Sequence, residues 1–210
     1  MKGYIKLRKE IIEILNTKLS KNLYYHGAHH SFTALDVCEH YLKYENIKGH
    51  QAKLLRIGIL LHDIGFIVSY ENHELVSSKI AVKLMTKHDC SKTDIEIVKN
   101  LILSTKLPQK PRTKLEQIIC DVDLDYLGGN NYTAISNQLY KELKIFSTPE
   151  ILKDWNKSQL HFLKTHKYHT NFAKRFRKPR KEKIIKELEL LAKENVKTTH
   201  NVEKEKVMAF

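Results

Sequence analysis

Hydrophobic residues recur at helical spacing along most of the chain. In residues 4–23 the apolar positions include Ile11, Leu15 and Leu19, and Lys and Glu fill many of the positions between them. Similar spacing marks further segments, namely 32–44, 52–62, 72–87, 95–104, 113–127, 133–146 and 149–166. This spacing predicts amphipathic helices, and no series of short alternating strands joined by Asn-Gly or Gly-Gly turns accompanies it. We therefore expect an all-α fold.

Local signals mark where several of these helices begin and end. Ser91-Lys92-Thr93-Asp94 resembles an N-cap that precedes the 95–104 helix. Gly128-Gly129 ends the 113–127 helix, and the two prolines in residues 107–111 indicate a loop. The third helix, 52–62, stops near Gly65.

The length of the chain, 210 residues, favours one large domain over two small ones. No apolar stretch reaches the roughly 18 residues of a membrane helix, and residues 1–10 lack the apolar region of a secretory signal. We therefore expect a soluble, cytoplasmic protein with no membrane partner. Cys38, Cys90 and Cys120 are far apart and lack C-x-x-C spacing, which favours reduced, buried thiols over disulfides or a thiolate metal site.

Basic residues outnumber acidic ones by 37 to 24, which gives a formal net charge of +13. This charge could attract nucleic acid, anionic lipid or a phosphorylated substrate. Much of it lies in residues 172–206, where basic side chains are frequent between Lys174 and Lys183. A solvated helical face is the expected explanation. Nucleic-acid binding is a minor hypothesis, because only Phe172 and Phe176 are close enough to stack on bases.

The dipeptide His62-Asp63 interrupts an otherwise apolar run, residues 57–65. An imidazole and a carboxylate are costly to bury unless a charged or hydrogen-bonding group receives them. A divalent metal ion can do this, because it binds nitrogen and oxygen ligands together. The pair therefore predicts a metal site, provided that other segments supply further ligands.

A histidine-rich segment precedes this pair in the chain. Residues 25–30 read Tyr-His-Gly-Ala-His-His, so His26 and His30 are four residues apart and would share one face of a helical turn. That spacing is compatible with a shared site. His29 remains an alternative to His30 as the ligand.

The acidic run that follows, residues 121–125, contains one carboxylate aimed inward. At about 100° per residue, Asp123 lies at the edge of the apolar face, between Ile119 and Leu127, whereas Asp121 points nearly opposite. We expect Asp123 to need a cation, with an internal Arg or Lys as the alternative partner. We expect Asp121 and Asp125 to remain hydrated or to accept hydrogen bonds from groups around the metal ligands.

These residues together form a mixed nitrogen and oxygen set, comprising His30, His62, Asp63 and Asp123. The set suits a six-coordinate divalent metal ion, such as Mn, Fe, Mg, Co, Ni or Zn. An ion held in this way polarises a phosphoryl oxygen and lowers the pKa of bound water, which generates a nucleophile. The expected chemistry is therefore the hydrolysis of a phosphate ester.

The motifs, in this order, closely resemble the HD-domain superfamily of metal-dependent phosphohydrolases. The resemblance rests on Tyr25-His26 with His30, on Leu61-His62-Asp63-Ile64-Gly65, and on the distant Asp123, and it extends from about residue 24 to 128. Residues 72–74 and 102–106 also look like a subgroup of predicted HD phosphohydrolases. The resemblance implies one HD-type helical domain over residues 1–195, with additional C-terminal helices and a flexible tail over 196–210.

The resemblance also implies roles for individual residues. The metal ligands would be His30, His62, Asp63 and Asp123. His26 would be the general acid for the leaving oxygen, although Gly27 replaces an Asn that is usual in the family and could orient it. The candidate catalytic residues are His26, Asp63 and Glu74.

The residues around Glu74 have alternative explanations. His73 and Glu74 could support the metal ligands, contact substrate or bridge to a second ion, or they could be ordinary polar residues at a helix start. Lys106 could clamp a substrate phosphate, although solvated lysines at helix ends are far commoner.

Two functions follow from these residues. The first is hydrolysis of a phosphomonoester or phosphodiester, with a nucleotide-like small molecule as the expected substrate. The second is a regulatory or nucleic-acid-binding module that keeps the fold but has little turnover, which Gly27 and the net charge of +13 motivate. The complete ligand set favours the enzyme.

Overall fold

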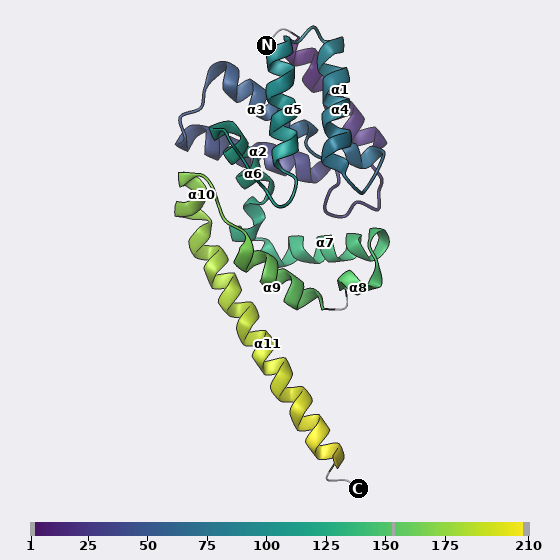
Figure 1. Ribbon diagram of the computed structural model, residues 1–210, viewed down its shortest axis with the longest axis vertical. Helices are drawn as coiled ribbons and strands as arrows, with labels where there is room; N and C mark the ends of the chain where they lie inside the picture. Colours follow the sequence, from purple (N-terminus) through teal and green to yellow (C-terminus); the bar gives the residue numbers. More distant parts are fainter. Residues whose placement is uncertain (1–2, 153, 208–210) are drawn as a thin grey trace.

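The computed structural model describes residues 3–152 and 154–207, and these residues contain helices and no strand (Figure 1). The all-α prediction is confirmed. The elements in chain order are α1 Tyr4–Lys18, α2 Ala28–Tyr44, α3 Gly49–Leu61, the 3-10 helix η1 Ile64–Ile67, α4 His73–Lys87, α5 Lys92–Ser104, α6 Lys114–Asp123, the 3-10 helix η2 Asp125–Gly128, α7 Tyr132–Phe146, α8 Pro149–Leu152, α9 Trp155–Thr165, α10 Asn171–Phe176 and α11 Lys178–Val207.

Helix α3 is the centre of the fold, because it is buried on nearly every side. Its side chains enter both hydrophobic cores: Leu54, Ile57 and Leu60 pack with α1, α4 and α5, whereas Leu55 and Ile59 pack with α2 and α6. A helix that is apolar all round is stable only in such an interior. The consequence is that His62-Asp63, at the end of α3, lies inside the protein.

Helices α1 to α6 form a bundle, and α7 to α9 lie across one end of it (Figure 1). The core that contains Leu55 and Ile59 continues into this layer through Tyr132 of α7 and Leu163 of α9. Helix α11 starts beside the bundle, passes α9 and runs away from the rest of the molecule (Figure 1).

Several helix boundaries differ from those expected. The 113–127 helix ends at Asp123, and η2 follows it, because Leu124 leaves helical geometry with φ −102° and ψ 20°. The 149–166 helix divides into α8 and α9, since the Asp154 carboxylate caps a new helix by accepting from the N–H of Lys157. The 172–206 segment likewise divides into α10 and α11 at Arg177.

The expected N-cap at Ser91 is confirmed, because its hydroxyl accepts a hydrogen bond from the N–H of Asp94. Helix α6 begins with a full capping box, in which Thr113 and Glu116 satisfy each other's backbone N–H groups. The capping box fixes the start of α6, the helix that carries Asp123.

Of the two alternatives expected for Asp121 and Asp125, hydration is wrong, because both are buried, and both carboxylates accept hydrogen bonds. The Asp121 carboxylate accepts from the backbone N–H groups of His169 and Thr170 and from the Thr170 hydroxyl, at 2.7–3.1 Å. Asp125 accepts from the Tyr41 hydroxyl at 2.7 Å. Helical geometry turned Asp121 away from the metal side of α6, but the returning chain before α10 covers the opposite side too. Asp121 therefore attaches the segment between α9 and α10 to the bundle.

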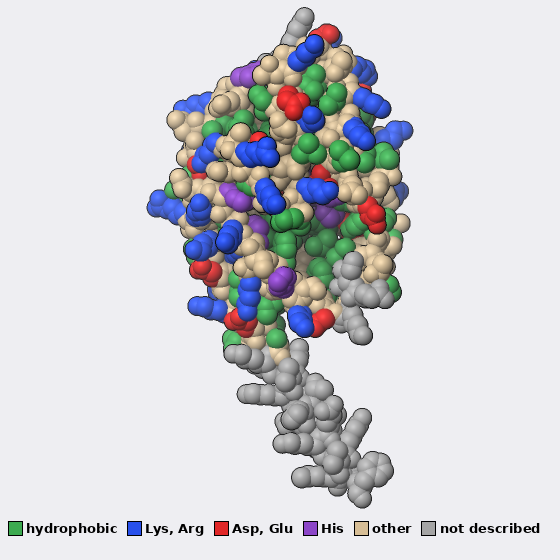
Figure 2. Space-filling model, viewed as in Figure 1, with side chains coloured by type: hydrophobic (Ala, Val, Ile, Leu, Met, Phe, Trp, Pro, Cys, Tyr) green, Lys and Arg blue, Asp and Glu red, His purple; other side chains and the backbone are tan. Residues whose placement is uncertain are grey.

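The basic C-terminal segment forms α10 and α11. Lys and Arg side chains are spread over the visible face rather than gathered in one patch (Figure 2). The domain boundary expected at residue 195 falls within α11, where no element ends, and residues 208–210 lie outside the described part of the chain. Among the described residues, no helix is both long enough and apolar enough to span a membrane.

We predict that Asp121→Ala destabilises the protein by about 2–4 kcal/mol, because it leaves buried N–H groups of His169 and Thr170 without their acceptor. Urea unfolding followed by circular dichroism measures this. Asp36→Ala, at an exposed position of α2, is the matched control and should change the free energy of unfolding by less than about 0.5 kcal/mol. Equal effects of the two substitutions would contradict the anchoring role of Asp121.

Candidate metal centre

The end of α3 orients the first two candidate ligands. His62 follows the last residue of α3, and its Nδ1–H donates to the carbonyl oxygen of Ile59 at 2.6 Å. This bond leaves Nε2 as the nitrogen that faces the site, an arrangement common in metal-ligating histidines. Asp63 lies in the turn between α3 and η1, with only 3% of its surface exposed.

Gly65 allows α4 to approach this turn. A Cβ atom at residue 65 would lie 2.1 Å from the carbonyl oxygen of His73 and 2.8 Å from the backbone nitrogen of Ser77. The N–H of Gly65 instead donates to the Ser77 hydroxyl at 2.8 Å. This close contact brings His73, the first residue of α4, to 3.4 Å from Asp63 between Nε2 and Oδ1.

His30 comes from the first turn of α2, which begins at Ala28 rather than near residue 32. His26 therefore precedes the helix, and the idea that His26 and His30 share one helical turn is wrong. The chain instead bends at Gly27, where the backbone is extended and the carbonyl accepts from the N–H of His30. The two rings still lie near each other, with centroids 6.1 Å apart. His29 is exposed and lies outside the cluster.

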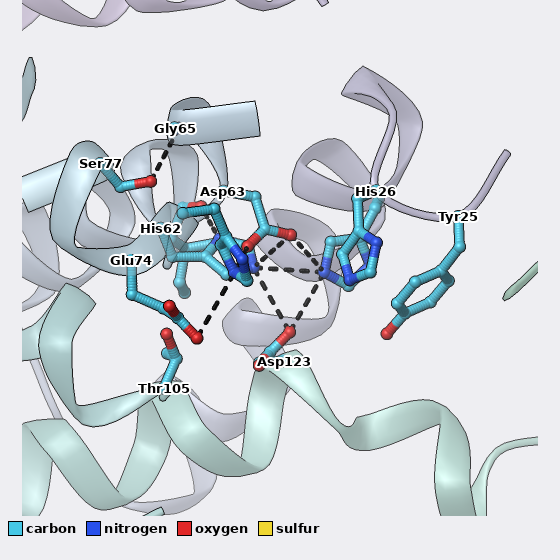
Figure 3. A network of polar contacts seen from close by, with 12 residues as sticks. Tyr25, His26, His62, Asp63, Gly65, Glu74, Ser77, Thr105 and Asp123 are labelled. Carbon is cyan, nitrogen blue, oxygen red and sulfur yellow. Dashed lines mark hydrogen bonds and ion pairs between the residues drawn. The ribbon is translucent and has the colours of Figure 1, made fainter. Parts of the chain in front are cut away.

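Asp123 completes the cluster from the last position of α6. Its Oδ1 lies 3.2 Å from Nε2 of His30 and 3.3 Å from Nε2 of His62, and the two imidazole nitrogens are 3.2 Å apart. The Asp63 Oδ2 atom lies 3.3–3.5 Å from the same nitrogens. One donor atom from each of the four residues lies within 4.8 Å of the others. Figure 3 shows His62 and Asp63, from the end of α3, converging with Asp123, from the end of α6.

This donor set fits a divalent metal ion. Ligands about 2.1 Å from an ion lie roughly 3.0–3.5 Å from each other in octahedral or tetrahedral geometry, which agrees with the observed separations. Asp63 Oδ2 is moreover buried and has no hydrogen-bond partner among the described residues. A buried carboxylate oxygen of this kind requires compensation, and a cation among the four donors would supply it.

The two carboxylates make the cluster strongly attractive to positive charge. Burial alone would lower the pKa of His62, but Asp63 and Asp123 outweigh it and raise that pKa well above the ordinary value. Burial would raise the pKa of Asp123, whereas hydrogen bonds with His30 and His62 lower it to about 2. Both pKa shifts have one cause, the attraction between the carboxylates and the imidazoles, and the same negative charge favours a cation between these side chains.

Glu142 of α7 is a site residue that the sequence did not reveal. Its carboxylate is fully buried and accepts from the backbone N–H groups of Tyr25 and His26, at 2.8 and 3.0 Å, and from the Tyr70 hydroxyl at 3.0 Å. Its Oε1 also lies 2.5 Å from Nδ1 of His26. Burial would raise the pKa of Glu142, but the bonds from His26 and from the backbone N–H groups lower it below the ordinary value.

This contact replaces the orienting group that Gly27 lacks. Glu142 holds Nδ1 of His26, so Nε2 is the nitrogen that can serve the adjoining cavity. Phe66 stacks against the rings of His26 and His73, with centroids 4.4 and 4.0 Å away, and limits their rotation. In the sequence, Glu142 lies between lysines and resembles an ordinary solvated position, so only a search for a partner of His26 could have pointed to it.

The remaining candidate residues lie at increasing distance from the cluster. His73 Nε2 lies 3.6 Å from Glu74 Oε1 and is also close to Asp63. Burial would lower the pKa of His73, but the neighbouring Asp63 carboxylate raises it above the ordinary value. Glu74 is largely buried and reaches the cluster only through His73. Lys106 is exposed, and its ammonium donates to the side-chain oxygen of Asn72 at 3.0 Å.

The fold and this site define a helical protein with a buried two-histidine, two-aspartate centre. Residues 27–125 match the family model of the HD domain. A search of curated proteins and a search of solved structures each returned no match. Residues 27–125 thus form an HD domain, the domain of a superfamily whose members are mostly metal-dependent hydrolases, and the His/Asp cluster could hold a divalent metal ion.

We predict that His30→Ala weakens Mn²⁺ binding at least 100-fold, because a ligand should cost more than the roughly 10–100-fold typical of residues that support ligands. Isothermal titration calorimetry of chelator-treated protein measures this affinity.

His29→Ala is the matched control, since residue 29 is the adjacent histidine and is exposed. It should leave the Mn²⁺ affinity unchanged. A larger loss with His29→Ala than with His30→Ala would reverse the assignment.

Proposed function

We propose that this protein is a divalent-metal-dependent phosphohydrolase that cleaves a phosphate ester of a small molecule. The observation that carries the proposal is the cluster of four donor atoms within 4.8 Å, one of which is the buried Asp63 Oδ2, an atom that accepts no hydrogen bond among the described residues. The match to the HD domain supports the same class of reaction. A divalent ion held by His30, His62, Asp63 and Asp123 would polarise a phosphoryl oxygen and lower the pKa of a bound water molecule.

His26 is the proposed general acid. Hydrolysis adds water across the ester: the water oxygen bonds to phosphorus, the bond from phosphorus to the ester oxygen breaks, and that oxygen leaves as an alcohol. The acid is the imidazolium form of His26: its Nε2–H would donate the proton to the leaving oxygen, and the proton released by water restores the imidazolium. Glu142 is a positioning residue, because it accepts from Nδ1–H and its negative charge favours the imidazolium that can donate from Nε2.

His73 and Glu74 are proposed to assist from the other side of Phe66. His73 lies beside Asp63 and lines the same cavity as His26, so its ring can donate a hydrogen bond to a phosphoryl oxygen. Glu74 would fix the orientation of His73. Lys106 has no place among the residues that line this cavity, which leaves it a peripheral role in phosphate binding.

A second candidate function is the binding of nucleic acid. It is supported by a groove of about 550 Å³ that contains Arg175, Arg177 and Arg180. All three side chains already have partners within the chain, since Arg175 donates to the Tyr44 hydroxyl, Arg177 to Asp125 and Arg180 to the carbonyl oxygen of Gly129. Binding of a polynucleotide that weakens steeply with salt, without hydrolysis of any phosphate ester, would favour this function.

The principal test is metal-dependent hydrolysis. Protein loaded with Mn²⁺ should hydrolyse p-nitrophenyl phosphate, and the paired substitution His62→Ala with Asp63→Ala should reduce the rate to background, because it removes two of the four donors. His29→Ala should retain the full rate. Undiminished hydrolysis by the paired variant would refute the proposal.

The role of His26 predicts a dependence on the leaving group. His26→Gln should slow the hydrolysis of an alkyl phosphate about 100-fold to 10,000-fold, but it should slow p-nitrophenyl phosphate much less, because nitrophenolate leaves without a proton. Glu142→Gln should show the same dependence with a smaller loss, since Gln keeps the shape but not the charge that orients His26.

Mn²⁺ affinity separates this role from structural damage, and both variants should keep it. A uniform loss of rate across all leaving groups would assign His26 and Glu142 to the fold rather than to proton transfer.

A further inference from the structure

The candidate metal centre opens into a cavity of about 500 Å³ whose far walls are apolar. Its polar end carries the groups already described, among them His26, Asp63 and His73. The rest is lined mainly by Leu124, Leu127, Tyr132, Leu139, Leu143, Trp155, Phe162 and Leu163. In the space-filling view, hydrophobic side chains surround a hollow between the bundle and α7, with histidine nearby (Figure 2).

Two helices outside the region matched to the HD domain build this apolar wall. Helix α7 contributes residues 132, 136, 139 and 143, and α9 contributes residues 155, 158, 159, 162 and 163, so each helix presents one face. Three polar groups on these faces pair with one another, because Gln159 Oε1 accepts from both the Tyr132 hydroxyl, at 2.8 Å, and the Ser136 hydroxyl. The buried Nε1–H of Trp155 has no hydrogen-bond partner among the described residues. The wall is otherwise mainly apolar.

The cavity also lacks the cations that a polyphosphate would need. Among its described lining residues there is no Lys and no Arg, in a chain that has 37 of them. Three arginines line the other groove together with His30, whereas His26, Asp63, His73 and Glu74 line the apolar cavity, and Asp123 lines both. Di- and triphosphates bind through several charge-assisted contacts. A single phosphoryl group at the metal centre fits this distribution of charge.

We propose that the substrate is a phosphomonoester whose organic part is apolar and lies between α7 and α9. This inference rests on the proposed function, because it places the phosphoryl group at the candidate metal centre. It differs from the nucleotide-like substrate expected from the sequence, since a ribose and a base would leave polar groups unpaired against leucine and phenylalanine. The choice of substrate would then be determined by α7 and α9 rather than by the region matched to the HD domain.

The binding experiment uses alkylphosphonates, which carry a stable P–C bond and are not hydrolysed. Trp155 is the only tryptophan of the chain and lines the cavity, so its fluorescence reports occupation of the apolar wall. We expect the affinity of Mn²⁺-loaded protein to rise about threefold to fourfold with each methylene from methyl- to hexylphosphonate, as burial of a methylene predicts. An affinity that does not change with chain length would overturn the proposal.

A pair of leucine substitutions tests the location. Leu139→Asn, in the wall from α7, should weaken hexylphosphonate binding at least tenfold more than methylphosphonate binding. Leu190→Asn, at an exposed position of α11, makes the same chemical change outside the cavity and should have no effect. Because the first result is a ratio between two ligands of one variant, a general loss of folded protein cannot produce it.

Hydrolysis separates this inference from the proposed function. Hexyl phosphate should be hydrolysed with a higher kcat/KM than methyl phosphate or any 5′-nucleoside monophosphate. Faster hydrolysis of a nucleoside monophosphate would overturn the apolar substrate and leave the phosphohydrolase standing. Binding that depends on chain length, with no hydrolysis of any ester, would overturn the phosphohydrolase and leave the apolar binding site standing. The absence of both binding and hydrolysis would overturn both proposals.

Discussion

A carboxylate buried at the end of an apolar helix is the constraint around which this protein is arranged. Asp63 has 3% of its surface exposed, and one of its oxygens has no hydrogen-bond partner among the described residues. A low-dielectric interior tolerates this only when positive charge is near, and the surrounding segments bring two imidazoles and leave room for an ion. The start of α2, the end of α6 and the close approach of α4 at Gly65 all converge on this carboxylate. The same charge that makes the position expensive to fold makes it chemically useful.

The two layers of the fold contribute different groups to the site. The bundle of α1 to α6 supplies the four donor atoms, whereas α7 supplies Glu142 and, with α9, most of the apolar wall of the cavity. His26 lies between the two layers, since its backbone and ring are both held by Glu142, and its ring stacks on Phe66 of the core. The candidate metal ligands and the residue that orients the proposed acid thus come from different parts of the chain.

Periodicity was sufficient for the fold class and for most helices, because burial of an apolar face is a local property of the sequence. It also indicated that Asp123 faces inward, since that depends only on angles around one helix. It failed where partners are distant in sequence. Asp121 is turned away from the metal side as expected, yet it is buried by residues 48 and 49 positions later. Glu142 reaches His26 across 116 positions, and nothing in its own neighbourhood marks it.

The run from Asp121 to Asp125 joins three separate structures with alternate residues. Asp121 binds the chain before α10, Asp123 faces the two histidines, and Asp125 accepts from Tyr41 and Arg177. Each contact depends on the direction of its side chain around α6 and η2, so the three are coupled by register. Substitution at one position would disturb one junction, but insertion or deletion of a single residue would rotate all three away at once. The spacing of these three aspartates is therefore as important to the structure as their identity.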